Sequence, residues 1–282
     1  MKALSVSIKP EMPAKPLEHQ EPVILRSQDT RGVVTLTLNR PRAFNALSQA
    51  MLTALQHELD AIGQDKSIRV VVLAAEGKAF CAGHDLKEMR AKPSLEYYER
   101  LFNQCFQMML AVQQLPVPVI ARVQGIATAA GCQLVAMCDL AVASTAARFA
   151  VSGVNLGLFC SAPGVGLSRN VLRKLAFEML VTGEFISAEE AKARGLVNRV
   201  VEPEYLDAEV DKLVTAIIAK PRVAVAMGKE FFYRQIELDI APAYEAAAQS
   251  MACNMMDEAA LEGVQAFIDK RIPRWSQNTK ST

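Results

Sequence analysis

The sequence predicts an α/β fold that is followed by an all-helical C-terminal region. Short runs of aliphatic residues, such as 70–74 and 119–123, alternate with helix-like stretches in the first part of the chain. After Pro203 the strand-like runs stop, and prolines stand near the first turn of two helix-like stretches. The helices expected there span residues 203–219, 221–235, 241–256 and 257–270. We therefore divide the chain into a tail (1–21), an α/β core (22–202) and a C-terminal helical region (203–282).

The elements of the core can be assigned in chain order. Strands at 23–27 and 33–38 flank the turn Asp29-Thr30-Arg31-Gly32, which predicts a hairpin. Ser48 is a suitable N-cap for a helix to about Ile62, whose apolar residues recur on one face. The next elements expected are a strand at 69–75, a helix at 94–114, a strand at 119–123 and a helix at 131–137.

Composition excludes several classes of protein. The 282 residues are 51% hydrophobic and carry a formal net charge of +1, so no partner of strongly opposite charge, such as nucleic acid or a membrane surface, is expected. Six cysteines without a C-x-x-C pair, together with three histidines, do not favour a metal site and suggest core-filling thiols in a reducing compartment. The first 21 residues lack the pattern of a targeting peptide, so they are expected to be a flexible tail of a cytoplasmic protein.

Two loops rich in glycine and alanine are the most informative part of the sequence. They are residues 78–86 (KAFCAGHDL) and 125–133 (GIATAAGCQ), and each follows a strand-like run. Small residues at a strand-to-helix turn let a ligand approach the backbone and leave unpaired N–H groups that point at it. Two such turns can hold one carbonyl oxygen between two amides, which is the geometry of an oxyanion hole.

With these loops the chain resembles the crotonase superfamily, also called the enoyl-CoA hydratase/isomerase family, from about Val23 to Trp275. The resemblance also rests on residues 39–47 (NRPRAFNAL) and on motifs that continue in family order to 262–267 (EGVQAF). The runs GHDLKE and GLFCS are similar to those of the branch called enoyl-CoA hydratase domain-containing protein 3. The resemblance implies the crotonase (ClpP/crotonase-like) fold, which is a superhelix of stacked ββα turns with a C-terminal helical region for trimerisation.

The resemblance also implies a site for an acyl-CoA thioester, with no cofactor other than the coenzyme A of the substrate. The oxyanion donors would be the backbone N–H groups of His84 and Ala130, while the His84 imidazole either points away or donates a proton. Phe267 and Lys270 would reach the CoA of a neighbouring subunit in a homotrimer or dimer of trimers. For Arg42, Lys78 and Lys87 the alternative is ordinary surface charge. The residues expected to contact substrate or CoA are Arg42, Ala43, Phe44, Ala46, Lys78, Ala82, Gly83, His84, Asp85, Leu86, Lys87, Gly131, Phe267 and Lys270.

The sequence departs from the family at both acid–base positions. Hydratases of the family have two glutamates where this chain has Gln133 and Gly153. Hydration needs one group that takes a proton from water and another that gives a proton to the α-carbon. We expect Gly153 to enlarge the pocket, and Cys160 to be either a reactive group or a packing residue. The chain is thus expected to be a hydratase/isomerase-like enzyme that stabilises an enolate, an acyl-CoA-binding protein with little turnover, or a catalyst of another acyl-CoA reaction such as thioester hydrolysis or decarboxylation.

Overall fold

The computed structural model describes residues 21–91 and 93–276, and its body is built around two β-sheets. The strands are β1 (Ile24–Gln28), β2 (Val33–Leu38), β3 (Val70–Ala75), β4 (Ala79–Cys81), β5 (Val119–Val123), β6 (Ile126–Thr128), β7 (Leu140–Ser144), β8 (Arg148–Ala150), β9 (Ile186–Ser187) and β10 (Arg199–Val201). One sheet has the order β1-β2-β3-β5-β7-β10 and the other β4-β6-β8-β9. The expected β1–β2 hairpin is confirmed as antiparallel, and the other neighbours in the first sheet are parallel.

The helices fill the intervals between these strands and the C-terminal part of the chain. They are α1 (Gln49–Gln64), α2 (Leu86–Ala91), α3 (Leu95–Gln114), α4 (Ala130–Met137), α5 (Ser161–Asn170), α6 (Arg173–Thr182), α7 (Ala188–Ala193), α8 (Leu206–Ile218), α9 (Arg222–Gln235), α10 (Ile240–Met255) and α11 (Glu258–Ile268), with short 3-10 turns η1 (Pro41–Ala43), η2 (Ser152–Leu156), η3 (Pro203–Tyr205) and η4 (Arg274–Ser276). The Ser48 hydroxyl accepts the Met51 N–H at 3.2 Å, so the expected N-cap is confirmed. No helix in the described ranges has the length and apolar character that crossing a bilayer requires.

The two sheets advance in step along the chain. In the first sheet β3, β5 and β7 are neighbours, and in the second β4, β6 and β8 follow the same order. Each turn therefore adds one strand to each sheet, and the chain returns through a helix such as α3 or α4. This arrangement confirms the stacked ββα superhelix implied by the family resemblance.

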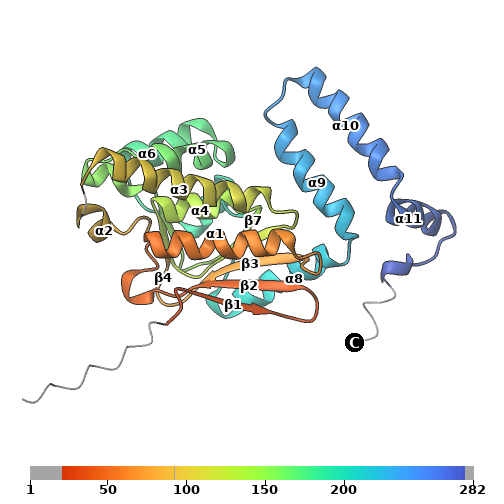
Figure 1. Cartoon of the computed structure of the whole chain (residues 1–282), viewed down its shortest axis with the longest axis horizontal. Helices are drawn as coiled ribbons and strands as arrows, with labels where there is room; N and C mark the ends of the chain where they lie inside the picture. The colour runs from red at the N-terminus through yellow and green to blue at the C-terminus, as the bar shows by residue number, and fades with distance from the viewer. Residues whose placement is uncertain (1–20, 92, 277–282) are drawn as a thin grey trace, which may run out of the picture.

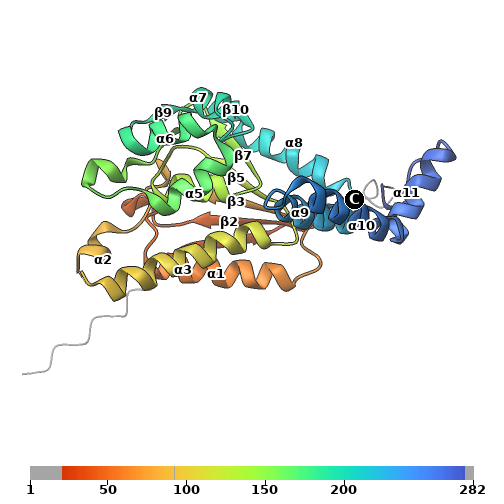
Figure 2. The ribbon, with the colours of Figure 1, turned by 90° about the horizontal axis from the view of Figure 1, so that it is seen from above.

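Helices cover both faces of the six-stranded sheet. Val71 and Leu73 of β3 pack with residues of α1 and α3, which lie along one face in Figure 2, while Val70 and Val72 pack with α8 on the other. The division follows from the alternation of side chains along a strand. Although α8 follows residue 203, it therefore belongs to the body around the sheet. Five of the six cysteines are buried, and Cys253 is exposed.

Helices α9, α10 and α11 extend away from the sheets, and we call them the arm (Figures 1 and 2). Each is a helix close to its expected range, but together they bury only Lys229, Ala243 and Ala266. Large apolar side chains of the arm are exposed, including Phe267 at 86% and Ile240 at 73%. An apolar surface of this kind is typical of a region that another chain covers.

Candidate functional site

The two glycine-rich loops lie side by side at one edge of the four-stranded sheet. Each loop begins with a short strand, β4 in the first and β6 in the second, and these strands pair in parallel and therefore end at the same edge. A Cβ added to Gly83 would lie 3.1 Å from the backbone nitrogen of Ala130, and one added to Gly131 would lie 2.0 Å from the carbonyl oxygen of Cys81. Only glycine fits at Gly131, so the loops meet backbone to backbone.

The expected oxyanion amides, those of His84 and Ala130, both lack a backbone acceptor within residues 21–91 and 93–276. Leu47 accepts the Asp85 N–H at 3.3 Å and donates to the Gly83 carbonyl at 2.8 Å. These two hydrogen bonds involve the residues on either side of His84, so the N–H of His84 points away from Leu47. The Ala130 N–H is the first of α4, where a helix leaves its amides unpaired. Two adjacent amides thus remain free for a ligand oxygen.

A strained residue sets the direction of the second amide. Ala129 has φ 50° and ψ −123°, a conformation that alanine rarely adopts. Such a residue costs on the order of 1–3 kcal/mol and persists only when its surroundings hold it. The Ala129 N–H donates to the Ala150 carbonyl at 3.0 Å, which fixes the turn between β6 and α4. The strained conformation of Ala129 therefore determines the direction in which the Ala130 N–H points.

Polar contacts from the segment 39–47 anchor the first loop. Arg40 pairs with Asp85 at 3.1 Å and donates to the Ala46 carbonyl at 3.0 Å. Burial acts to raise the pKa of Asp85, but the Glu88 amide and Arg40 outweigh it and hold the pKa below its usual value. Fully buried Asn45 donates to two carbonyls of the adjoining segment, both at 2.8 Å. Arg40 and Asn45 both stand in the motif 39–47, but their anchoring role was not predicted from the sequence.

The His84 side chain packs into the body of the protein. Its ring meets Phe102 of α3 edge-on, with 5.3 Å between centroids, and its Nδ1 is buried without a hydrogen-bond partner among the described residues. Burial lowers the pKa of the imidazole, which is therefore neutral near pH 7. A half-buried neutral ring that packs on Phe102 favours the alternative in which only the backbone of His84 acts.

The two positions that depart from the family are both buried. Gln133 is buried on α4, and Gly153 lies in η2, where its N–H donates to the Cys160 sulfur at 3.3 Å. A Cβ on Gly153 would lie 2.5 Å from the Leu158 carbonyl oxygen and 2.6 Å from that sulfur. The expectation that Gly153 enlarges the pocket is therefore wrong, because Leu158 and Cys160 fill the space. Burial also raises the pKa of the Cys160 thiol, which opposes a nucleophilic role.

Three exposed cations surround the first loop. Arg42, Lys78 and Lys87 form no ion pair in the described part of the chain. The Phe44 carbonyl accepts the Ala82 N–H at 3.0 Å, which holds the turn carrying Arg42 against this loop. Unpaired cations of this kind suit phosphate groups. Of the other residues expected to contact ligand, Phe44 and Leu86 are exposed, Ala43 is half-buried and Ala46 is buried.

Phe267 and Lys270 are not brought to the loops within one chain. Both lie at the far end of the arm, and Figures 1 and 2 show α11 at the opposite end of the molecule from α2. Phe267 is 86% exposed and Lys270 directly follows α11. Within a single chain, the expected contact of Phe267 and Lys270 with a ligand at the loops is therefore not formed.

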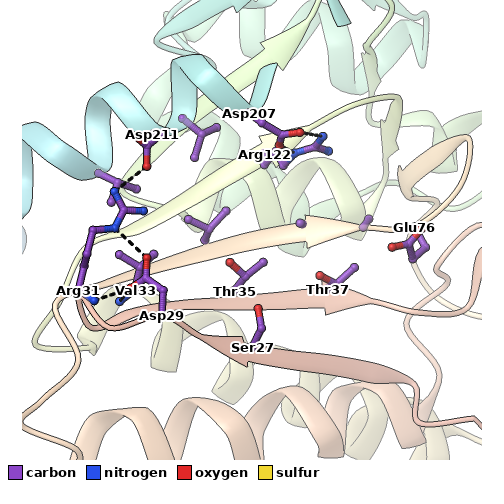
Figure 3. Close-up of a pocket in the computed structure, with 15 residues that line it drawn as sticks. Ser27, Asp29, Arg31, Val33, Thr35, Thr37, Glu76, Arg122, Asp207 and Asp211 are labelled. Atoms are coloured by element: carbon purple, nitrogen blue, oxygen red, sulfur yellow. Dashed lines mark hydrogen bonds and ion pairs between the residues drawn. The ribbon is translucent and has the colours of Figure 1, made fainter. Parts of the chain in front are cut away.

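A separate cavity of about 440 Å³ lies on the face of the six-stranded sheet beside α8 (Figure 3). Its arginines are already paired, Arg31 with Asp29 and Asp211 at 2.8 Å each, and Arg122 with Asp207. No residue of the two loops lines it. Within the described residues, no cluster of three or more metal-binding side chains occurs. The loops therefore remain the candidate site.

Comparison with known proteins identifies relatives along almost the whole chain. The family model described as enoyl-CoA hydratase/isomerase matches residues 28–278. Enoyl-CoA hydratase domain-containing protein 3 of Rattus norvegicus is 44% identical over 264 residues, which cover 94% of this chain and 87% of the relative. A crystal structure of an enoyl-CoA hydratase from Mycobacterium smegmatis is 70% identical with a TM-score of 0.90, and covers 90% of this chain and 99% of its own. The human domain-containing protein 3 is 43% identical with a TM-score of 0.87, covering 90% and 100%.

These relatives correct one expectation. The domain-containing protein 3 relatives from rat, mouse, Xenopus laevis and human are all named as mitochondrial. This finding contradicts the cytoplasmic location expected from the sequence. That expectation depended on the pattern of the N-terminal tail, and residues 1–20 of the tail lie outside the described residues.

Proposed function

Because the chain belongs to the enoyl-CoA hydratase/isomerase family, we propose that it binds an acyl-CoA thioester and polarises the carbonyl between the amides of His84 and Ala130. The observation that carries the proposal is the pair of unpaired N–H groups on two loops in backbone contact. In other enzymes one such donor contributes about 2.7–4 kcal/mol to transition-state stabilisation. Arg42, Lys78 and Lys87 supply charge for the phosphates of CoA.

The proposed assembly is a homotrimer or a dimer of trimers. It is supported by the apolar side chains that the arm exposes and by the distance of Phe267 and Lys270 from the loops of their own chain. In an assembly of this kind the arm of one chain would complete the site of the next. Light scattering should therefore give a multiple of three protomers.

The chemistry open to this site is enolate stabilisation with little help from side-chain acids or bases. An amide at Gln133 has no usable pKa, and Gly153 has no side chain. Loss of a positioned acid or base lowers the reaction rate by about 10²–10⁴-fold for each group. We therefore propose slow hydratase or isomerase chemistry, with acyl-CoA binding without turnover as the second candidate. The filled space beside Gly153 favours the second, because it leaves no room for a replacement acid there.

Affinity measurements test the proposal directly. Calorimetry would compare butyryl-CoA with S-butyl-CoA, a thioether of the same chain length that lacks the carbonyl oxygen. We call the ratio of these two affinities the carbonyl ratio. Two amide donors predict a carbonyl ratio of about 10 or more. Equal affinities would contradict the oxyanion site, and hydration of crotonyl-CoA as fast as in a two-glutamate hydratase would contradict the assigned loss of acid–base catalysis.

A further inference from the structure

A buried ion pair joins the arm to the body of the protein. The Lys229 side chain, in α9, is 6% exposed, and its ammonium donates to the Asp139 carboxylate at 2.7 Å. It also donates to the carbonyls of Val112 and Val117, at 3.1 and 3.0 Å. The second oxygen of Asp139 accepts the Tyr233 hydroxyl at 2.8 Å. Every ammonium proton thus has an acceptor, and we call Lys229, Asp139 and Tyr233 the root network.

No apolar side chain of α9 is fully buried where the arm meets the body. A cavity of about 840 Å³ lies between α9 and residues 113–116, and Lys229 is the one buried residue of α9. A buried ion pair is often no more stabilising than apolar side chains of the same volume. The role of the root network is therefore to position α9 against the body as well as to stabilise the protein.

The root network holds the C-terminal ends of the two helices that support the oxyanion amides. Asp139 follows the end of α4 and is fixed to the start of β5 by two hydrogen bonds with the backbone of Val119, at 3.0 and 2.6 Å. The eight residues of α4 span about 12 Å, and its first residue is Ala130. Val112 belongs to the last turn of α3, the helix whose Phe102 packs against His84.

We propose that Lys229 is a positioning residue for the oxyanion site. By holding Asp139 it fixes the far end of α4, and so it sets where the Ala130 amide lies relative to the arm. The identity of the ligand in this inference rests on the proposed function, whereas the placement of α4 does not. One side chain thereby links the attachment of the arm to recognition of the thioester.

The test compares Lys229→Met with Lys212→Met. Methionine keeps the length of the side chain without its charge, and Lys212 is an exposed lysine paired with Glu209 at 2.7 Å on α8, which makes it a matched control. In Lys229→Met the carbonyl ratio should fall about tenfold while affinity for S-butyl-CoA stays within about twofold. Hydrogen exchange of the amides in α4 should become at least about tenfold faster. The infrared carbonyl band of bound butyryl-CoA should lose most of its shift to lower frequency, and Lys212→Met should change none of these.

A folded Lys229→Met protein with the wild-type carbonyl ratio and wild-type exchange in α4 would overturn the inference. If that variant does not fold, the same measurements on Tyr233→Phe decide. This substitution removes one donor to Asp139 and leaves the ion pair, so the carbonyl ratio should fall about threefold. Combining Lys229→Met with Asp139→Asn removes both charges. Recovery of the wild-type carbonyl ratio in this double variant would mean that Lys229 only neutralises the charge of Asp139. That result would overturn the positioning role. A carbonyl ratio of one in the wild type would refute the proposed function, while exchange in α4 would still decide the role of Lys229.

Discussion

Replacing Gly131 by alanine is expected to misplace the Ala130 amide without unfolding the protein. The new Cβ would lie 2.0 Å from the carbonyl oxygen of Cys81 and 2.6 Å from its carbonyl carbon. Both atoms are backbone of β4, which is held in the four-stranded sheet, so α4 has to move instead. Restoring an ordinary contact requires a displacement on the order of 1 Å.

A misplacement of this size is large for a hydrogen-bonding site. About 1 Å can cost 10²-fold in turnover, and loss of one amide donor should lower the carbonyl ratio by up to about tenfold. Overpacking at the loop contact should also lower the free energy of unfolding by about 1–3 kcal/mol. Calorimetry with butyryl-CoA and S-butyl-CoA, together with denaturant unfolding, measures the two effects separately.

Gly228→Ala is the matched control, because a Cβ on Gly228 in α9 would meet nothing within 4 Å. This substitution should leave the carbonyl ratio unchanged and raise stability by about 0.5–1 kcal/mol, since alanine favours a helix over glycine. A folded Gly131→Ala protein whose carbonyl ratio stays within about twofold of wild type would refute the assignment of the Ala130 amide as an oxyanion donor.

Three further predictions concern the neighbouring residues. Cys160→Ala should lower the free energy of unfolding by about 1 kcal/mol and leave the carbonyl ratio intact, because the thiol packs against Gly153; loss of the ratio in a folded protein would instead indicate a direct role. Gly153→Glu, alone or with Gln133→Glu, should impair folding rather than restore hydration, since the Leu158 carbonyl occupies the path of the side chain; thermal unfolding and a crotonyl-CoA assay would show this, and a stable, faster double variant would contradict it. Asp85 has a pKa below its ordinary value of 3.8, so its contribution to stability is complete above about pH 4 and is lost as pH falls further; Asp85→Asn should flatten that part of the curve of melting temperature against pH, and an unchanged curve would argue against the Arg40–Asp85 anchor.

Local signals predicted the elements better than they predicted the site's surroundings. Ser48 caps α1 because a cap depends on residues three apart, and the β1–β2 hairpin follows from its own turn. The space beside Gly153 was misjudged, because it is filled by residues that return to it only after the loop folds. Lys229 was missed for a similar reason: its partner Asp139 lies 90 positions earlier in the chain. A lysine directly after the apolar run 223–228 was the available signal.

The conformation of Ala129 has a consequence for any attempt to make this protein more heat-resistant. A positive φ at a non-glycine residue is a standing source of instability, so a screen for thermal tolerance should repeatedly select glycine or asparagine at this position. Glycine would relax the turn between β6 and α4 and widen the range of directions open to the next amide. The variants that survive heating best would then be those that bind a thioester oxygen least well. Selection for heat resistance alone would thus remove the fixed direction of the Ala130 N–H on which recognition depends.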